Sequence, residues 1–249
     1  MAASTRKRLD HLLVERGLFA TRSRARDAIV RRTVRVEGSV IDRPAFACPP
    51  DAAIAVDDPA RGYVSRAALK LKAALAAFDV PVAGAACLDL GASTGGFTQV
   101  LLEHGAARVT AVDVGHGQLH ESLRADPRVR LIEGVNARDL SPAHLGGAAP
   151  QVVVCDTSFI SLTLVLPPAL ALAAPGAHLV ALVKPQFEVG RALIGKGGLV
   201  APDDAQAAAR DIGAWLDAQS GWRARGLVPS PIAGGDGNRE CLLWGEKVG

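Results

Sequence analysis

The sequence predicts an α/β architecture in which a mostly parallel sheet of seven strands, the last one antiparallel, follows a small α+β unit. From residue 85 onward, short apolar runs alternate with helical stretches, as is typical of a parallel sheet covered on both faces. The first sixty residues instead hold two short helical patterns and a few brief strands. A polar stretch with Pro and Gly at about 57–64 predicts a linker, which gives domains at 1–60 and 65–249.

The small unit starts with a helix that ends at Gly17, and Ser23 is placed to cap a second helix that continues to Val30. Apolar and polar residues alternate over 34–40, which predicts a hairpin, and residues 54–56 add a strand. Eleven Lys or Arg but only five Asp or Glu stand in the first fifty residues, although the chain has a net charge of only +3. This asymmetry predicts a polyanionic partner, with a merely solvated charged surface as the alternative.

The strands of the larger unit alternate with helices up to the last pair. A helix that continues to Phe78 leads into the sheet, and another begins at Phe97 after the first strand. Two prolines and a glycine-rich turn separate the last two strands, which predicts a hairpin and makes the final strand antiparallel. The expected strands cover residues 85–90, 109–112, 130–132, 151–155, 178–183, 222–228 and 240–244.

Composition argues against several classes of protein. The four cysteines lie far apart without a C-x-x-C pair, so free thiols in a reducing compartment are expected. His116 and His120 have no third ligand nearby, so we expect no metal. No secretory signal opens the chain, and prolines interrupt its longest apolar region, Leu162 to Val183. We therefore expect a cytoplasmic protein with no membrane partner.

A glycine-rich loop at 88–97, Leu-Asp-Leu-Gly-Ala-Ser-Thr-Gly-Gly-Phe, joins the first strand of the sheet to a helix N-terminus with free N–H groups. Asp113, which ends the second strand, is placed to hydrogen-bond a ribose diol. The spacing differs from the dinucleotide pattern Gly-x-Gly-x-x-Gly, and Asp89 would repel a pyrophosphate but suits a cationic ligand. The loop therefore favours S-adenosylmethionine, with a loop that binds nothing as the alternative. The candidate cofactor-binding residues are Asp89, Gly91, Ser93, Thr94, Gly95, Gly96, Phe97, Asp113, Asn136 and Ala137.

Charged residues follow abruptly on several apolar strands. Asp156 and Lys184 each come directly after such a strand, and Glu240 starts the last one. The carboxyl ends of parallel strands meet at one edge of a sheet, so these side chains are expected to line one crevice with Asp113. The sequence leaves open whether Lys70, on the helix that enters the domain, reaches this crevice. Charges at strand ends that only solvate loops are the alternative.

Two further motifs suggest other chemistry. Gly190 to Lys196 matches the phosphate-binding pattern Gly-x-x-x-x-Gly-Lys, but Gly197 stands where magnesium binding needs Ser or Thr, so a flap over substrate fits better. Gly91 to Gly95 matches the Gly-x-Ser-x-Gly elbow of hydrolases, with Asp156 as the candidate acid. The one histidine in suitable order, His178, opens its strand and so points to the opposite edge of the sheet.

Three segments together closely resemble the TlyA family: Leu88 to Thr98 (LDLGASTGGFT), Asp156 to Leu162 (DTSFISL) and Leu182 to Glu188 (LVKPQFE). That family comprises ribosomal RNA cytidine 2′-O-methyltransferases, historically also labelled haemolysins. The segment Asn238 to Trp244 and a Gly-Lys-Gly-Gly run extend the resemblance. A small RNA-binding domain shared with a ribosomal small-subunit protein is similar to the N-terminal part of the chain at Arg8 to Asp10, Gly17, Ser23-Arg24 and Val34 to Gly38.

The resemblance implies a Rossmann-like methyltransferase domain that uses S-adenosyl-L-methionine and acts on cytidine ribose in 16S or 23S ribosomal RNA, or both, within ribosomal subunits. It implies a catalytic tetrad, which falls on Lys70, Asp156, Lys184 and Glu240. Ala67-Ala68 replaces a frequent Gly-Gly, and His116 stands where Tyr is common. The candidate RNA-binding residues are Arg6, Arg8, Arg22, Arg24, Arg26, Arg31, Arg32 and Arg66. A non-catalytic ribosome-assembly factor, a haemolysin and a base methyltransferase are the alternatives.

In the expected chemistry, Lys184 orients and deprotonates the ribose 2′-hydroxyl while Asp156 orients Lys184. Burial and Lys70 favour the neutral form of Lys184, whereas Asp156 and Glu240 favour the charged form, so the sequence leaves its protonation state open. A purely positional role for this lysine is the alternative. Neutralising Arg24, Arg31 and Arg32 is expected to weaken RNA binding and flatten its salt dependence.

Overall fold

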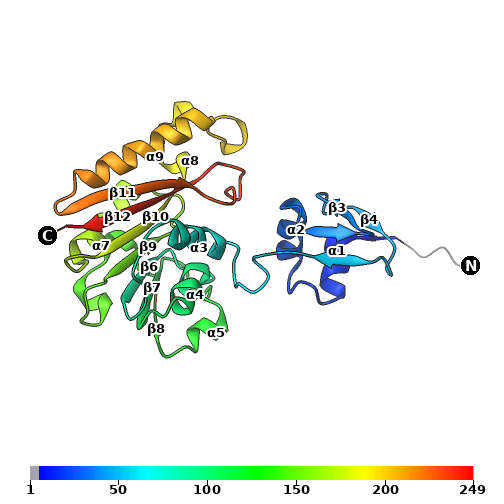
Figure 1. The fold of residues 1–249 in the computed structure, drawn as a ribbon, viewed down its shortest axis with the longest axis horizontal. Coiled ribbons are helices and arrows are strands. Elements are labelled where there is room, and N and C mark those ends of the chain that lie inside the picture. The colour runs from blue at the N-terminus through cyan, green and yellow to red at the C-terminus, as the bar shows by residue number, and fades with distance from the viewer. Residues whose placement is uncertain (1–5, 249) are drawn as a thin grey trace, which may run out of the picture. The chain divides into compact units, whose positions relative to one another are not determined.

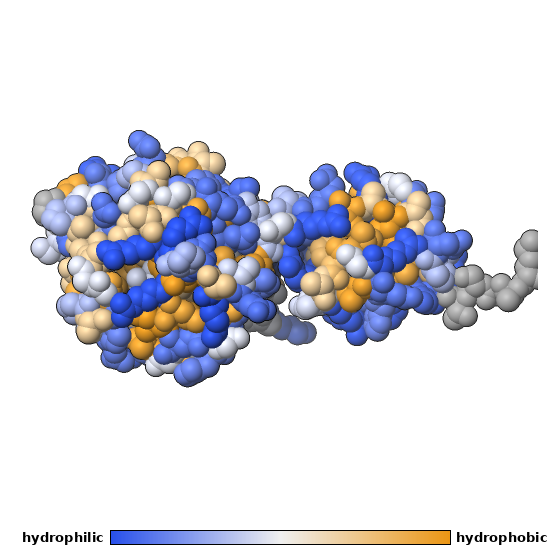
Figure 2. All heavy atoms as spheres, turned by 90° about the horizontal axis from the view of Figure 1, so that it is seen from below, coloured by the Kyte–Doolittle hydropathy of each residue, from blue (hydrophilic) through white to orange (hydrophobic). Residues whose placement is uncertain are grey.

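The computed structural model describes residues 6–248, which divide between Gly62 and Tyr63 into two compact units (Figure 1). Each unit has a hydrophobic core of its own. Hydrophilic residues cover much of the surface seen in Figure 2, with apolar patches between them. Across residues 6–248, no helix is both long enough and apolar enough to cross a membrane.

The smaller unit packs two helices, α1 (Leu9–Glu15) and α2 (Arg22–Val30), beside a three-stranded sheet. The predicted hairpin is present as β2 (Val34–Val36) and β3 (Ser39–Ile41), and β5 (Ile54–Val56) pairs with the other side of β2. A further pair, β1 (Lys7–Arg8) with β4 (Ala47–Cys48), was not predicted, because strands of two residues carry no alternating pattern.

The expected cap of α2 is wrong by two positions. The side chain of Thr21, not Ser23, accepts a hydrogen bond from the backbone N–H of Arg24 at the start of the helix. Either residue type can cap a helix, so sequence alone could not choose between them. The first helix is followed, as expected, by Gly17 in the left-handed conformation with φ at 67°.

The larger unit is built on the predicted seven-stranded sheet, in which β12 alone runs in the opposite direction to the other six strands (Figure 1). Along the sheet the strands stand in the order β11-β12-β10-β9-β6-β7-β8. The last two strands form the expected hairpin, and the α/β prediction is confirmed. In chain order the strands are β6 (Ala86–Leu90), β7 (Arg108–Asp113), β8 (Val129–Glu133), β9 (Val152–Cys155), β10 (His178–Val183), β11 (Trp222–Pro229) and β12 (Cys241–Lys247).

Helices cover both faces of this sheet, because alternate side chains of its central strands point to opposite sides. Val153 joins one core with α6 (Leu162–Val165), α7 (Pro167–Leu172) and α9 (Pro202–Asp217). Val152 and Val154 join the other core with α3 (Ala68–Ala77), α4 (Gly96–Glu103) and α5 (Glu121–Arg124). The remaining helical turns are α8 (Pro185–Glu188) and the 3₁₀ turns η1 (Ala137–Asp139), η2 (Pro142–Leu145), η3 (Arg191–Leu193) and η4 (Lys196–Gly198).

Strand direction brings distant polar residues to one edge of the sheet. Strands β6, β9 and β10 run parallel, so the residues that follow them emerge together. Strand β12 runs the other way, and its first residue, Cys241, is paired with Val183 at the end of β10. Glu240, directly before β12, therefore lies at the same edge as Lys184, directly after β10.

Candidate functional site

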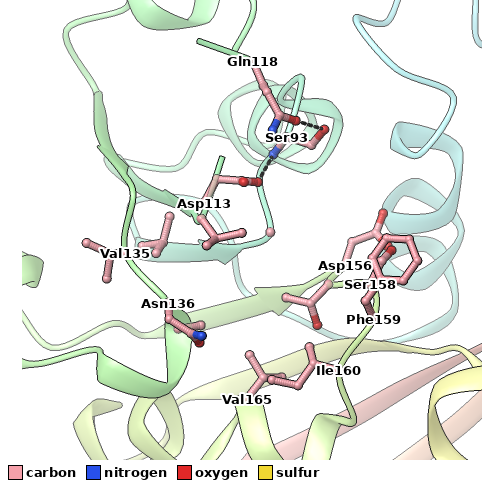
Figure 3. A pocket seen from close by; sticks show the side chains of 15 residues that line it. Ser93, Asp113, Gln118, Val135, Asn136, Asp156, Ser158, Phe159, Ile160 and Val165 are labelled. Atoms are coloured by element: carbon pink, nitrogen blue, oxygen red, sulfur yellow. Dashed lines mark hydrogen bonds between the residues drawn. The ribbon is translucent and has the colours of Figure 1, made fainter. Parts of the chain in front are cut away.

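Two adjoining cavities open at this edge of the sheet. The larger, of about 490 Å³, lies between the ends of β6, β7 and β9, and the smaller, of about 180 Å³, lies beside the start of α4. Both are lined by Gly91, Ser93, Asp156 and Ser158, which therefore mark their junction. Figure 3 shows Asp156, Ser158 and Phe159 grouped on one side of the larger cavity.

Most of the predicted cofactor residues line these cavities. Of the ten candidates, five belong to the larger cavity: Gly91, Ser93, Asp113, Asn136 and Ala137. Thr94, Gly96 and Phe97 line the smaller one, together with Gly91 and Ser93. Gly95 and Asp89 line neither cavity: Gly95 packs against the side chains of Leu119 and Leu123, and Asp89 is fully buried.

The carboxylate of Asp113 holds the glycine loop in place. One oxygen accepts a hydrogen bond from the backbone N–H of Ser93 at 2.8 Å, and the other accepts one from Gly115 at 2.7 Å. The Ser93 hydroxyl in turn donates to the Gln118 side chain at 3.0 Å (Figure 3). Each carboxylate oxygen has two lone pairs, so Asp113 can also accept hydrogen bonds from a ligand in the cavity.

Two glycines of the loop are required by their surroundings. Gly91 has φ at 77°, and a Cβ there would stand 3.0 Å from the backbone oxygen of Asp156. Gly95 has φ at 98°, and a Cβ there would overlap the side chain of Leu123. The loop therefore needs glycine both for its left-handed turns and for its close contact with the segment that carries Asp156.

Asp89 is a buried carboxylate that points toward α4. One of its oxygens accepts a hydrogen bond from the Thr98 hydroxyl at 2.7 Å, and the other has no partner among the described residues. Burial raises the pKa of Asp89 to about 7, although the hydrogen bond from Thr98 opposes the shift. Its side chain lies behind the loop and not on the cavity wall, so a direct contact with a cationic ligand stays a prediction.

The four tetrad candidates form two ion pairs. Lys70 Nζ lies 2.5 Å from Glu240 Oε2, across 170 positions of sequence, and Lys184 Nζ lies 2.7 Å from Asp156 Oδ1. Lys70, Lys184 and Glu240 are each less than a tenth exposed. Burial raises the pKa of Glu240, while the charge of Lys70 opposes the rise. Lys184 also lines the smaller cavity, together with residues of the glycine loop.

Several residues of the site were missed by the sequence analysis. The hydroxyl of Ser158 accepts a hydrogen bond from Lys184 Nζ at 2.7 Å. Gln118 fixes the Ser93 hydroxyl, and Val135 and Phe159 line the larger cavity. All four stand on loops, where no periodic pattern marks them. Two signals were available for Ser158: its proximity to the strand end at Asp156, and its place in the segment Asp156 to Leu162, which carries part of the family resemblance.

Several of the candidate RNA-binding arginines form ion pairs or hydrogen bonds within the protein. Arg8 and Arg22 lie 3.0 and 2.9 Å from the buried carboxylate of Asp10. Burial alone would raise the pKa of Asp10, and the hydrogen bonds from these two arginines instead lower it to about 2. Arg6 and Arg24 donate to backbone carbonyls, and Arg66 lies in the larger unit near Gly235.

Arg31 is part of a carboxylate network inside the smaller unit. Its guanidinium binds Asp58 through two hydrogen bonds of 2.9 Å and Asp27 through one of 2.8 Å. These partners compensate its charge, so Arg31 is a weaker candidate for a phosphate contact than the sequence suggested. Arg26 and Arg32 are exposed and make no ion pair within the described part of the chain.

The hydrolase hypothesis is wrong. The Ser93 hydroxyl hydrogen-bonds to Gln118 instead of a histidine. His178 opens β10 at the opposite edge of the sheet, where it accepts a hydrogen bond from the Trp244 indole. The phosphate-loop hypothesis fails as well, because residues 190–196 follow α8 instead of a strand and form short 3₁₀ turns. No cluster of three or more metal-ligating side chains occurs in residues 6–248.

Comparison with known proteins gives the family. The model of FtsJ-like methyltransferases matches residues 63–247, and that of the S4 domain matches residues 7–54. The 16S/23S rRNA (cytidine-2′-O)-methyltransferase TlyA of Mycobacterium tuberculosis is 48% identical over 242 residues, which are 96% of this chain and 89% of that protein.

Two other similarities extend over nearly the whole chain. Hemolysin A of Brachyspira hyodysenteriae is 38% identical over 235 residues, or 94% of this chain and 98% of that protein. The solved structure of a hemolysin candidate from Streptococcus thermophilus superposes with a TM-score of 0.76 at 40% identity, and covers 99% of this chain and 90% of its own. The chain therefore belongs to the TlyA family of FtsJ-like methyltransferases.

Proposed function

We propose that this protein transfers a methyl group from S-adenosyl-L-methionine to the 2′-hydroxyl of cytidine in 16S or 23S ribosomal RNA, or both. The observation that carries the proposal is the junction of the two cavities at Asp156 and Ser158, where the Lys184 amine donates a hydrogen bond to the Ser158 hydroxyl. A cofactor cavity that adjoins a buried lysine suits a reaction in which a hydroxyl must lose its proton beside an activated donor.

The residues present fit S-adenosyl-L-methionine. The Asp113 carboxylate faces the larger cavity and keeps lone pairs for a ribose diol, while Val135, Asn136 and Ala137 offer a mixed apolar and polar wall for adenine. The turn that begins at Gly91 leaves room that a Cβ would fill. When bound, S-adenosyl-L-methionine would supply a methyl group on a positively charged sulfur, and that sulfur would take the electron pair of the sulfur–methyl bond.

Within this proposal, Lys184 accepts the proton of the 2′-hydroxyl. A ribose hydroxyl is a weak acid, so a base within hydrogen-bond reach contributes about 10²–10⁴-fold to the rate. Asp156 attracts the amine, and the Lys70–Glu240 pair holds a second cation and anion next to it. In-line placement of donor and acceptor contributes further, by roughly 7–11 kcal/mol at best.

The smaller unit, residues 1–60, would bind the ribosomal RNA, and residues 65–249 would carry out methyl transfer. Support comes from the S4 match and from the exposed arginines Arg26 and Arg32. The name of the tuberculosis relative gives both subunit RNAs as its substrates, and we extend that substrate class to this chain. Since ribosomal subunits are the target, we expect a cytoplasmic protein.

The test uses purified full-length protein, tritium-labelled S-adenosyl-L-methionine and ribosomal subunits without the modification. The wild type is expected to label RNA, and mapping should place the methyl on a cytidine 2′-oxygen. Lys184→Ala should lose about 10²–10⁴-fold in rate while it still binds the cofactor. Lys72→Ala, an exposed lysine on the same helix as Lys70, serves as the matched control. Cofactor binding by the wild type without any methyl transfer would instead indicate a non-catalytic assembly factor.

A further inference from the structure

Ser158 makes a contact with Lys184 that no tetrad residue makes. Its hydroxyl accepts a hydrogen bond from Nζ at 2.7 Å, and within residues 6–248 it is the sole group with such a bond to this amine. Asp156 Oδ1 lies equally near, at 2.7 Å, but outside the geometry of a hydrogen bond, and it accepts none from the described residues. Asp156 therefore attracts the amine by charge, while Ser158 fixes its direction.

The direction of the amine matters for proton transfer. Nitrogen in an amine has four tetrahedral positions, of which Cε takes one and the N–H that donates to Ser158 takes another. With these two fixed, the remaining two positions are fixed in space as well. A hydroxyl that enters the smaller cavity can then meet a nitrogen of set orientation. Without Ser158, rotation about the Cε–Nζ bond would leave the directions of these two remaining positions unset.

The segment that carries Ser158 is tied to the segment that carries Lys184 at a second point. Glu188, at the end of the short helix α8 that follows Lys184, accepts hydrogen bonds from the Ser161 hydroxyl at 2.6 Å and from the backbone N–H of Leu162 at 2.9 Å. Phe159, between these contacts, has φ at 66°, a left-handed conformation that is costly for a bulky residue. The surrounding contacts hold the chain in this shape.

Ser158 also stands where both reactants must meet. It lines the larger and the smaller cavity, and Figure 3 shows its side chain next to Asp156 on the wall of the larger one. We propose that Ser158 is a positioning residue for methyl transfer, which aims the Lys184 amine at the acceptor hydroxyl. This inference rests on the proposed function and adds to the tetrad a residue that acts through Lys184.

Because the Ser158 side chain is uncharged, its positioning role can be tested without changing the charges of the site. The charged groups around Lys184 are Asp156 after β9, Glu240 before β12 and Lys70 on α3. Ser158→Ala leaves all of these charges in place. The rate of methyl transfer should therefore fall because the amine loses its fixed direction, while the charges of the site stay the same.

The experiment compares Ser158→Ala, Ser158→Thr and the exposed control Ser220→Ala in single-turnover methyl transfer to ribosomal subunits. Ser158→Ala is expected to be about 10–100-fold slower, with cofactor and subunit affinities within about 2-fold of wild type. Ser158→Thr keeps the hydroxyl and should recover the rate to within a few fold. Thermal unfolding of each variant checks that the fold is retained.

A wild-type rate for Ser158→Ala, or a Thr variant as slow as the Ala variant, would overturn the role of Ser158. In those outcomes the wild type still transfers methyl groups, so the proposed function stands. A wild type that labels no RNA would overturn the proposed function, and the positioning role with it.

Discussion

Asp113 Oδ2 accepts a hydrogen bond from the backbone N–H of Ser93 at 2.8 Å, which joins the end of β7 to the glycine loop that follows β6. The two strands are neighbours in the sheet, with Leu90 opposite Val112. The acid thus has two tasks. It fixes the turn of the loop, and it presents its remaining lone pairs to the larger cavity.

Asp113→Asn should weaken cofactor binding more than it weakens the fold. The amide keeps one acceptor oxygen but loses the charge and the second acceptor, and hydrogen bonds to a charged group are worth about 1.5–3 kcal/mol. The dissociation constant for S-adenosyl-L-methionine should rise about 10–100-fold in calorimetric titration. Glu133, the residue opposite Asp113 on β8, lines neither cavity and supplies the matched control, Glu133→Gln. Equal losses in both variants would mean that Asp113 acts only through the local fold.

Gly91 and Gly84 allow a matched test of the close contact in the loop. Their φ angles are nearly the same, 77° and 73°, but a Cβ on Gly84 meets nothing within 4 Å, whereas one on Gly91 meets the backbone of Asp156. Both alanine variants should lose about 1–2 kcal/mol of stability to the left-handed conformation. Gly91→Ala alone should also displace Asp156 and slow methyl transfer about 10–100-fold. A Gly84→Ala enzyme that is equally slow would show that strain alone explains the loss.

The sequence predicted the sheet well because its strands are uninterrupted apolar runs, such as Val152 to Cys155, that end in a charge. The register and order of the strands bring the four tetrad residues together in one site. No local pattern in the sequence predicts the contact between Lys70 and Glu240, because these residues are 170 positions apart. Loop residues such as Ser158 escaped detection because their role depends on which side chain stands opposite. The sequence analysis assigned too many arginines to RNA binding for a similar reason. The carboxylates that neutralise Arg31 come from two separate segments, so the sequence does not show that they lie next to it.

The arginines of the smaller unit should separate into two classes in RNA binding. Arg26 and Arg32 are exposed without an ion pair in the described chain, so the double variant Arg26→Gln/Arg32→Gln should reduce the salt slope by roughly 1 for each of the two that binds a phosphate. Arg31→Gln should leave the slope unchanged but lower the unfolding temperature, because it leaves the buried Asp58 side chain without its ion-pair partner. Filter binding to ribosomal subunits over a range of potassium chloride concentrations measures the slopes, and a thermal melt measures the unfolding temperature. A slope that falls only with Arg31→Gln would reverse the assignment.

Asp89 should make the stability of the larger unit depend on pH. The pKa of Asp89 rises from 3.8 to about 7 on folding because of burial, so the folded state keeps a proton that the unfolded state releases between these values. Stability should therefore fall as pH rises from about 4 to 7 and level off above, by at most about 4 kcal/mol for this group. Asp89→Asn cannot release a proton and should lack this part of the slope.

Urea unfolding of the cofactor-free protein at pH 4.5 and pH 8 measures the difference. All three tryptophans, Trp215, Trp222 and Trp244, belong to the larger unit, so their fluorescence reports on its unfolding. The wild type should lose more stability than Asp89→Asn between the two pH values. Parallel losses would mean that Asp89 is ionised in the folded protein at pH 4.5 as well. In that case the unpartnered oxygen would need a donor such as water, and the buried charge could act on a cationic ligand across the glycine loop.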